Sequence, residues 1–237
     1  MRAANPSPLT LSGTNTWVVG HDPAWVVDPG PALPEHVAAV AAAAAAAGGA
    51  GGIVLTHDHR DHADGVGDLR ARLGGPPVAA MRHPADIALA DGDEVGPFRI
   101  AHLPGHAPDH VVLVAGDVAF TGDAVLGEGS VFIAPGGGGL GPYLDGLRRL
   151  RALGLARLYP GHGPVVEDPS AWLDAYVAHR LERERRLLDA LAAGVRGEPA
   201  LLDAAWSDVP AALRPAAAET LRAHLEKLRG EGRLPDD

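Results

Sequence analysis

One stretch of the sequence, Thr56-His57-Asp58-His59-Arg60-Asp61-His62, constrains the chain more than any other part. It holds three histidines and two aspartates and directly follows the apolar run Gly52 to Leu55, which predicts a buried strand. The chain has no cysteine, so a transition metal would be held by imidazole nitrogens and carboxylate oxygens, which zinc accepts. An ordinary polar loop has no reason to concentrate such side chains. The stretch therefore predicts part of a metal site.

Three further residues supply partners for this cluster. His106, Asp123 and His162 each lie in a short loop at the end of a predicted strand, beside a glycine or proline that lets the backbone turn. Strand ends of an α/β sheet are where sites are usually assembled. The three loops therefore predict that these side chains meet the cluster at one edge of the sheets.

The fold class is predicted to be α/β, because strands precede and follow helices with some antiparallel pairing among them. Residues 62–73 predict one helix, and residues 85–89 predict a second, short helix. The sequence Asp168-Pro169-Ser170 predicts the start of a long helix that runs to about Ala193, with more helix beyond it. We therefore expect a metal domain over residues 1–168 and a small helical, winged-helix-like subdomain over residues 169–237.

The charge balance limits the partners of the chain. The formal net charge is −10, which argues against general binding of nucleic acid or anionic membranes. Yet 10 of the 20 lysines and arginines lie at or after Arg180. A separate basic module and an ordinary mixed-charge helix surface both account for this concentration.

The sequence also indicates where the protein works. No cysteine means no disulfide framework, and the N-terminal residues lack the apolar region of a secretory signal. The apolar run from Val37 to Ala50 is too short to span a bilayer. We expect a cytoplasmic protein without a membrane partner, and apolar surface on the tail helices leaves a homodimer open.

The motif set resembles that of the metallo-β-lactamase superfamily in content and order, from about Leu9 to His162. The resemblance implies an αββα sandwich with two zinc ions in a cleft at one sheet edge. Carried over by position, it implies one set of ligands for each zinc ion and an aspartate that bridges them: His57, His59 and His106 for the first; Asp61, His62 and His162 for the second; and Asp123 between them.

The chemistry of such a site is hydrolysis. Two metal ions that share a hydroxide lower its pKa and clamp an ester-like group, so that the hydroxide attacks carbon or phosphorus. Asp61 and Asp123 are the carboxylates expected to serve catalysis, and manganese or iron suit the same ligand types as zinc. Asp28 and Asp58 are candidates for orienting the ligating imidazoles.

Several segments along nearly the whole chain resemble one branch of this superfamily, that of β-lactamase-like protein 2. They include Gly13-Thr14-Asn15-Thr16, Tyr159-Pro160-Gly161-His162-Gly163 and Tyr176-Val177-Ala178-His179-Arg180. The resemblance implies a C-terminal winged-helix-like domain and an endoribonuclease activity on single-stranded RNA; related sequences are similar to thioesterases that act on acyl carrier proteins. Asn15, His179 and Arg180 are the residues expected to contact substrate.

Three functions follow for comparison. The first is a phosphodiesterase acting on single-stranded RNA, which the tail's arginines favour. The second is a hydrolase of acyl carrier protein thioesters or small esters and thioesters, which the acidic surface favours. The third is a non-catalytic, metal-bound binding module. The positions of Arg180, Arg183 and Arg186 separate the first two, because arginines that line the cleft favour a polyanion and arginines that face solvent favour a thioester.

Overall fold

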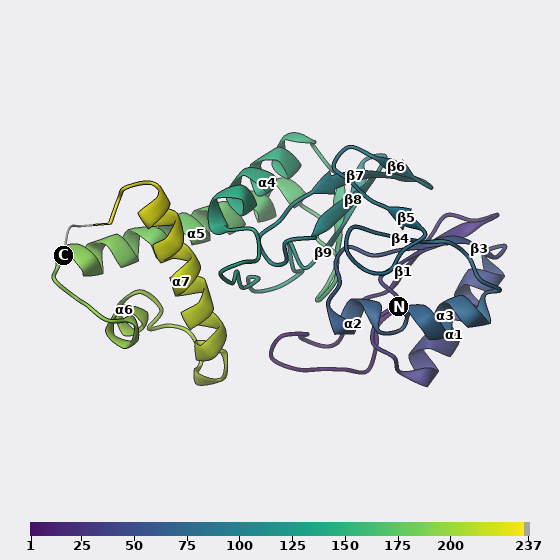
Figure 1. Ribbon diagram of the computed structural model, residues 1–237, viewed down its shortest axis with the longest axis horizontal. Coiled ribbons are helices and arrows are strands. Elements are labelled where there is room, and N and C mark those ends of the chain that lie inside the picture. Colours follow the sequence, from purple (N-terminus) through teal and green to yellow (C-terminus); the bar gives the residue numbers. More distant parts are fainter. Residues whose placement is uncertain (235–237) are drawn as a thin grey trace.

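The computed structural model describes residues 1–234 and contains two five-stranded sheets that face each other (Figure 1). The first sheet has the strand order β1-β2-β3-β4-β5, in which β1 and β2 are antiparallel and the other pairs are parallel. Its strands are β1 (Trp17–Val19), β2 (Ala24–Val27), β3 (Ala50–Val54), β4 (Val78–Ala80) and β5 (Ile87–Ala88).

The second sheet has the order β10-β9-β8-β7-β6 and is antiparallel except for the parallel pair β9 and β10. Its strands are β6 (Glu94–Val95), β7 (Phe98–His102), β8 (Val111–Ala115), β9 (Val118–Gly122) and β10 (Arg157–Pro160). In β8 the apolar side chains alternate: Val111 and Leu113 point between the sheets, while Val112 and Val114 point outward. This alternation lets one strand serve two cores.

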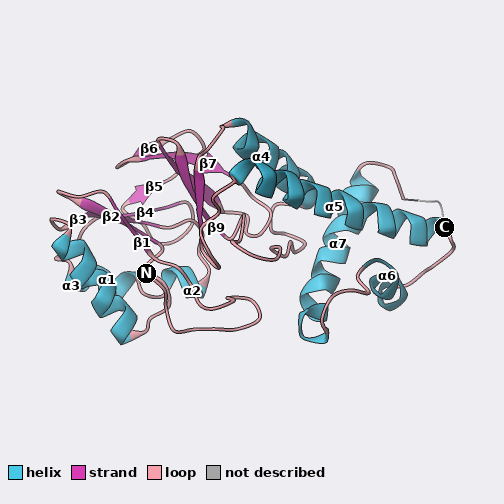
Figure 2. Cartoon of the chain, turned by 180° about the vertical axis from the view of Figure 1, so that it is seen from behind, coloured by secondary structure: helices cyan, strands magenta, loops and turns pink. Residues whose placement is uncertain are grey.

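Helices cover the outer face of each sheet, so that the metal-domain half of the chain is an αββα sandwich (Figure 2). The helices over the first sheet are α1 (Pro34–Ala46), α2 (Arg60–Ala63) and α3 (Val66–Arg72). The second sheet is covered by α4 (Leu140–Ala152) and the first half of α5 (Pro169–Ala192). The predicted α/β class and layered sandwich are confirmed.

The tail continues the long helix α5 into a separate apolar cluster. It consists of the second half of α5, α6 (Glu198–Ala205), a short 3₁₀ helix (Ala211–Leu213) and α7 (Arg214–Gly230). Leu187 and Leu191 of α5 belong to this tail core, whereas Leu173 and Tyr176 of the same helix belong to the core under the second sheet. The helix therefore joins the two cores, and the division at residue 169 stays a prediction.

The structure corrects two of the predicted elements. The predicted helix over residues 62–73 is interrupted, because Gly65 donates its backbone N–H to the carbonyl of Gly30 at 2.9 Å. A Cβ at Gly65 would lie 3.0 Å from that carbonyl oxygen, so the close approach needs glycine. The short helix predicted at residues 85–89 is instead the edge strand β5, because Ala79 and Ala80 of β4 pair with Ile87 and Ala88.

No helix within residues 1–234 has both the length and the apolar character needed to cross a membrane.

His224 of α7 makes the stability of the tail depend on pH. Both of its ring nitrogens are buried without a hydrogen-bond partner, and its ring lies edge-on to Trp206 at 5.5 Å. Burial and the nearby charge of Arg180 lower the pKa of His224 to about 3. An unfolded histidine takes up its proton near pH 6.5, so below that pH the unfolded chain gains the proton first and stability falls until about pH 3.

We expect His224→Phe to flatten this dependence. Linkage gives a slope of about 1.4 kcal/mol per pH unit below 6.5, so wild type should lose about 2 kcal/mol more between pH 7 and pH 5 than the variant. Urea unfolding at the two pH values measures the difference. The exposed His21→Phe should keep the wild-type slope. Equal slopes in wild type and His224→Phe would contradict this account.

Candidate metal centre

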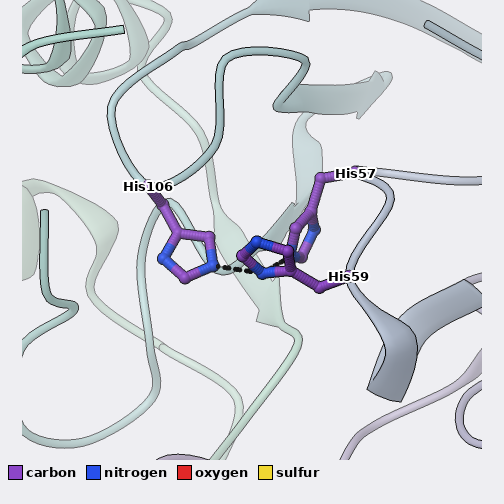
Figure 3. Close-up of side chains that lie close together, drawn as sticks. All are labelled: His57, His59 and His106. Carbon is purple, nitrogen blue, oxygen red and sulfur yellow. Dashed lines mark hydrogen bonds between the residues drawn. The ribbon is translucent and has the colours of Figure 1, made fainter. Parts of the chain in front are cut away.

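Three histidines from two loops converge at the carboxyl ends of the strands. His57 and His59 follow β3, and His106 follows β7. The Nδ1 atom of His59 lies 3.0 Å from His57 Nε2 and 2.9 Å from His106 Nε2 (Figure 3). Ring nitrogens that meet in this way form a group able to hold one metal ion.

A second group lies beside the first. Asp61 and His62 stand on the single-turn helix α2, and His162 follows β10. Asp61 Oδ2 lies 3.2 Å from His162 Nε2 and 3.5 Å from His62 Nε2. These three residues also meet the geometry of a metal-holding group.

Asp123 lies between the two groups and faces both. Its Oδ2 is 3.4 Å from His106 Nε2, while its Oδ1 is 3.4 Å from His62 Nε2 and 3.3 Å from His162 Nε2. The structure thus brings together all seven side chains for which metal ligation was predicted. Their role as ligands stays a prediction, and the arrangement is that expected of a bridging carboxylate.

The hydrogen bonds of three imidazoles occupy their Nδ1 atoms and leave their Nε2 atoms free to bind a cation. His62 Nδ1 donates to Asp28 Oδ2 at 2.9 Å, and His162 Nδ1 and His106 Nδ1 donate to backbone carbonyls at 3.3 and 3.4 Å. Because each Nδ1 carries its proton outward, each Nε2 faces the cluster. His62 Nε2 and Asp123 Oδ1 are buried and have no hydrogen-bond partner. The residues present therefore fit divalent cations.

His57 is oriented through Thr56. The Thr56 hydroxyl donates to Asp28 Oδ2 at 2.7 Å, so its oxygen accepts from His57 Nδ1 at 3.0 Å. Asp28 also accepts from the Thr56 backbone N–H at 2.8 Å. One buried carboxylate, that of Asp28, thus fixes an imidazole in each group, as predicted for it.

The electrostatics of the cluster reflect its mixed charge. Burial alone would lower the pKa of His62, but Asp123 and Asp28 raise it well above its ordinary value. The pKa of His162 rises to about 9, because its close contacts with the carboxylates of Asp123 and Asp61, at 3.3 and 3.2 Å, outweigh burial. Burial lowers the pKa of His57, and His62 lowers it further. Protons and metal ions therefore compete for the second group, and metal binding there weakens as the pH falls.

Glycines around the centre allow the loops to approach each other. A Cβ at Gly161 would lie 2.7 Å from both Asp123 Oδ1 and His62 Cε1. A Cβ at Gly122, whose φ is 46°, would lie 2.4 Å from the Thr56 hydroxyl. A larger residue at Gly161 or Gly122 would therefore collide with the side chains of the cluster, in addition to any effect on the turn.

Two supporting residues were missed by the sequence analysis. His110 is fully buried, and its Nε2 accepts the backbone N–H of Asp123 at 3.0 Å. Thr14 donates its hydroxyl to Asp61 Oδ2 at 3.2 Å. Their closeness to the cluster follows from tertiary packing, and only the Gly-Thr-Asn-Thr motif around Thr14 gave any signal.

A cavity of about 630 Å³ opens from this centre toward the tail. Asp61, His106, Asp123 and His162 border it at one side. Apolar atoms make up most of the lining, and polar residues such as Arg60 and Glu128 also contribute to it. The apolar side chains come from the N-terminal loop, the loop after Asp123 and the tail helices: Leu9, Leu11, Leu126, Val131, Phe132, Trp206, Val209, Leu213, Ala216 and Ala217. The cavity size is typical of small-molecule sites.

Helices α5 and α7 hold the loop that follows Asp123. Tyr176 Oη accepts the backbone N–H of Leu126 at 2.9 Å, and Trp172 Nε1 donates to the Leu126 carbonyl at 2.9 Å. Thr220 of α7 accepts the N–H of Ile133 at 3.2 Å. One wall of the cavity is thus positioned by α5 and α7.

The three residues expected to contact substrate lie in different surroundings. His179 and Arg180 line the cavity. Asn15 does not, because its side-chain amide donates to the carbonyls of Pro160 and Gly163 at 3.0 and 2.9 Å and holds the His162 loop. Asp58, expected to orient a ligand, instead pairs with His83 Nδ1 at 2.6 Å.

The three arginines used to compare RNA with a thioester as substrate neither all line the cavity nor all face solvent. Arg183 lines the cavity, yet it pairs with Asp208 at 2.5 and 2.8 Å and donates to the Ala205 carbonyl. Arg186 pairs with Glu182 at 2.9 Å and does not line the cavity. Arg180 alone of the three has no carboxylate partner within residues 1–234.

Family models match two parts of the chain. Residues 74–162 match the model described as metallo-beta-lactamase superfamily, and residues 199–236 match the model described as beta-lactamase associated winged helix domain. The first match begins after residue 62, so it does not include the His and Asp residues of the stretch 56–62. Those residues are separate evidence for the same superfamily.

Known proteins resemble the chain at greater length. The beta-lactamase-like protein 2 homolog of Drosophila melanogaster is 31% identical over 260 residues, spanning 97% of this chain and 87% of that protein. The atrochrysone carboxyl ACP thioesterase of Aspergillus chevalieri is 35% identical over 202 residues, spanning 80% of this chain and 64% of that protein. A metallo-beta-lactamase family protein from Thermus thermophilus has the same fold, with a TM-score of 0.78, 23% identity and coverage of 98% and 92%.

Proposed function

The chain belongs to the metallo-β-lactamase superfamily and carries the winged-helix domain associated with it, and from this premise we propose that it hydrolyses thioesters with an apolar acyl group, using two zinc ions. The single observation that carries the proposal is the mainly apolar cavity that opens from the metal centre. Such a cavity suits an acyl chain, whose thioester carbonyl would then lie at the centre. The thioesterase among the relatives adds support.

Zinc suits the ligand types of the centre. Five imidazoles and two carboxylates form the two groups, with no thiolate to favour softer ions. When bound, the two ions supply Lewis acidity toward the thioester carbonyl and an activated water as nucleophile.

The side chains of the centre perform the remaining tasks. Thr14 orients the Asp61 carboxylate, which borders the cavity and is the base placed to accept a proton from the attacking water. Burial would raise the pKa of Asp61, but the hydrogen bond from His162 lowers it, so the carboxylate is ionised. Hydrolysis forms the C–O bond of the acid and breaks the C–S bond, and the thiolate leaves with the proton.

The apolar side chains select the acyl group. Phe132, Leu126 and Leu213 remove it from water, which is worth about 0.8 kcal/mol for each methylene buried. We therefore expect kcat/KM to rise about fourfold for each methylene added to the acyl chain until the cavity is filled.

Cleavage of single-stranded RNA, the first expectation from the sequence, stays a prediction that the surface favours less. A chain of net charge −10 repels a polyanion, and the guanidinium groups of Arg183 and Arg186 are paired with carboxylates. Helix α5 therefore does not present a row of unpaired arginines that could bind successive phosphates. A non-catalytic binding role is also disfavoured, because the metal groups border an open cavity.

The test is a comparison of thioesters and RNA with zinc-loaded protein. Acyl thioesters of N-acetylcysteamine with increasing chain length should release thiol at increasing rates, while single-stranded oligonucleotides should stay intact. Ala217→Leu narrows the cavity and should raise KM for long acyl groups only; Ala211→Leu, at an exposed position that does not line the cavity, should behave as wild type. RNA cleavage without thioester hydrolysis would overturn the proposal in favour of a phosphodiesterase.

The expected partners follow from the proposal. They are a small acyl thioester or an acyl group carried on a protein, within the cytoplasm and without a membrane. Sedimentation of the purified protein checks the homodimer that the sequence left open.

A further inference from the structure

Two consecutive residues of α5, His179 and Arg180, are among the polar residues that line the cavity. Arg180 is only 2% exposed, and its Nη2 donates to the Val131 carbonyl. Its Nε is buried and has no partner, and no carboxylate within residues 1–234 pairs with it. A buried guanidinium without a counter-charge is costly, so it needs an explanation.

His179, the preceding residue, presents a second such donor. Arg183 Nε donates to His179 Nε2 at 3.3 Å, so Nε2 must be the unprotonated nitrogen. The proton therefore sits on His179 Nδ1, which is buried and has no partner within the described residues. Two consecutive residues that line the cavity thus each carry a buried N–H without an acceptor among the described residues.

The surroundings leave the charge of Arg180 uncompensated. Asp208 neutralises Arg183, and Glu184 neutralises Lys227 at 2.6 Å. Beside Arg180 lie Tyr143, whose ring centroid is 5.9 Å from its guanidinium carbon, and Tyr176. Burial raises the pKa of both tyrosines, so neither carries a compensating charge. Burial and the charge of Arg180 lower the pKa of His179 to about 4, so this imidazole stays neutral and adds no charge of its own.

We infer that Arg180 and His179 form an oxyanion-binding subsite, which takes a carboxylate or phosphate group of the substrate whose thioester lies at the metal centre. The inference rests on the proposed function and narrows its substrate class to thioesters that bear a negative charge. A carboxylate at the far end of the acyl group and a phosphate on the thiol part are the two sources of this charge. Either would meet the positive charge of Arg180 and the N–H of His179.

Four thioesters separate the two sources. Hexanoyl and adipoyl groups have equal chain length, but only adipoyl ends in a carboxylate. N-acetylcysteamine is uncharged, and coenzyme A carries phosphates. Each acyl group on each thiol gives a set in which one, both or neither end is anionic.

Arg180→Gln should raise KM about 10- to 100-fold for substrates whose anion reaches the subsite, with little change in kcat and little effect on hexanoyl-N-acetylcysteamine. A loss confined to adipoyl substrates identifies the acyl carboxylate, and a loss confined to coenzyme A substrates identifies the phosphate. His179→Phe, which leaves the Arg180 contact with Val131 in place, should give a smaller rise on the same substrates. Arg185→Gln, the same change at an exposed position of α5, should have no effect.

A purely structural role for Arg180 predicts a different result. If its contact with Val131 only holds the loop, Arg180→Gln should lower kcat equally for all four substrates, and this outcome overturns the inference. Where Arg180→Gln does not fold, as judged by its thermal unfolding, His179→Phe decides: a KM change that ignores substrate charge overturns the inference as well.

Binding of the product acids tests the subsite without the reaction. Calorimetry with metal-free protein should show that adipate or inorganic phosphate binds at least about tenfold more tightly than the uncharged hexanamide, and that Arg180→Gln removes the difference. If wild type hydrolyses none of the thioesters, the proposed function fails, yet this binding result still supports or overturns the subsite. Equal binding of all three probes to wild type and variant overturns it.

Discussion

Asp123→Asn is expected to lower kcat on the order of 10³-fold while the fold is retained. Asp123 faces both metal groups, with oxygens 3.3–3.4 Å from His62, His106 and His162. An amide keeps the size of the side chain but removes its charge and replaces one acceptor oxygen with a donor. The loss is severe because the neighbouring imidazoles of His62 and His162 are buried and depend on this carboxylate for their charge balance.

The measurements are zinc content after dialysis, thioester turnover and thermal unfolding. We expect the variant to retain less than two zinc ions per chain at a zinc concentration that saturates wild type. Asp58→Asn is the matched control, since Asp58 stands in the same stretch but pairs with His83. A fully active Asp123→Asn protein with two zinc ions would exclude the bridging role.

Gly161→Ala should have the second largest effect, a loss of activity of about 10²-fold from a single methyl group. The added carbon would lie 2.7 Å from Asp123 Oδ1 and from His62 Cε1, which is closer than Cβ contacts occur. One of these two side chains must therefore shift, and each belongs to the metal centre. The backbone of Gly161 does not have a positive φ, so the cost is steric crowding of about 1–3 kcal/mol.

Gly67→Ala is the control for this substitution. Gly67 lies within α3, and a Cβ there meets no atom within 4 Å. The variant should keep its activity and gain up to about 1 kcal/mol of stability, because alanine favours the helix. Zinc affinity and turnover separate the two alanines, and an active Gly161→Ala protein with wild-type zinc affinity would show that the centre tolerates displacement.

The residues of the metal centre were predictable because ligand chemistry limits the choice so strongly. A chain without cysteine that concentrates His and Asp in one loop leaves few ways to hold a metal, and strand ends mark where the partners lie. The long helix α5 was equally predictable from the proline after Asp168, whose side chain accepts the N–H of Ala171 at 3.0 Å. In both cases a local pattern had only one good structural solution.

Other features depended on tertiary contacts that no local pattern reports. The break in the predicted helix at Gly65 exists only because the backbone of Gly30 approaches it. The role of His110 follows from its position under the Asp123 backbone, and Asn15 holds a loop that lies far along the sequence. The apolar lining of the cavity likewise combines an N-terminal loop with tail helices that sequence separation keeps apart.

The hydrogen bonds from the tail to the loop after Asp123 bear on how such a protein can diverge. Tyr176 and Trp172 hold Leu126, and Thr220 holds Ile133, so the loop that closes the cavity has its backbone partners in another part of the fold. A catalytic half lifted out at residue 168 would leave those backbone groups to water and its cavity without a wall. Helices α5 and α7 therefore form part of the cavity at the metal groups and do not act as an independent module. Substitutions in α5 and α7 that change the substrate would have to keep the hydrogen bonds that hold this loop.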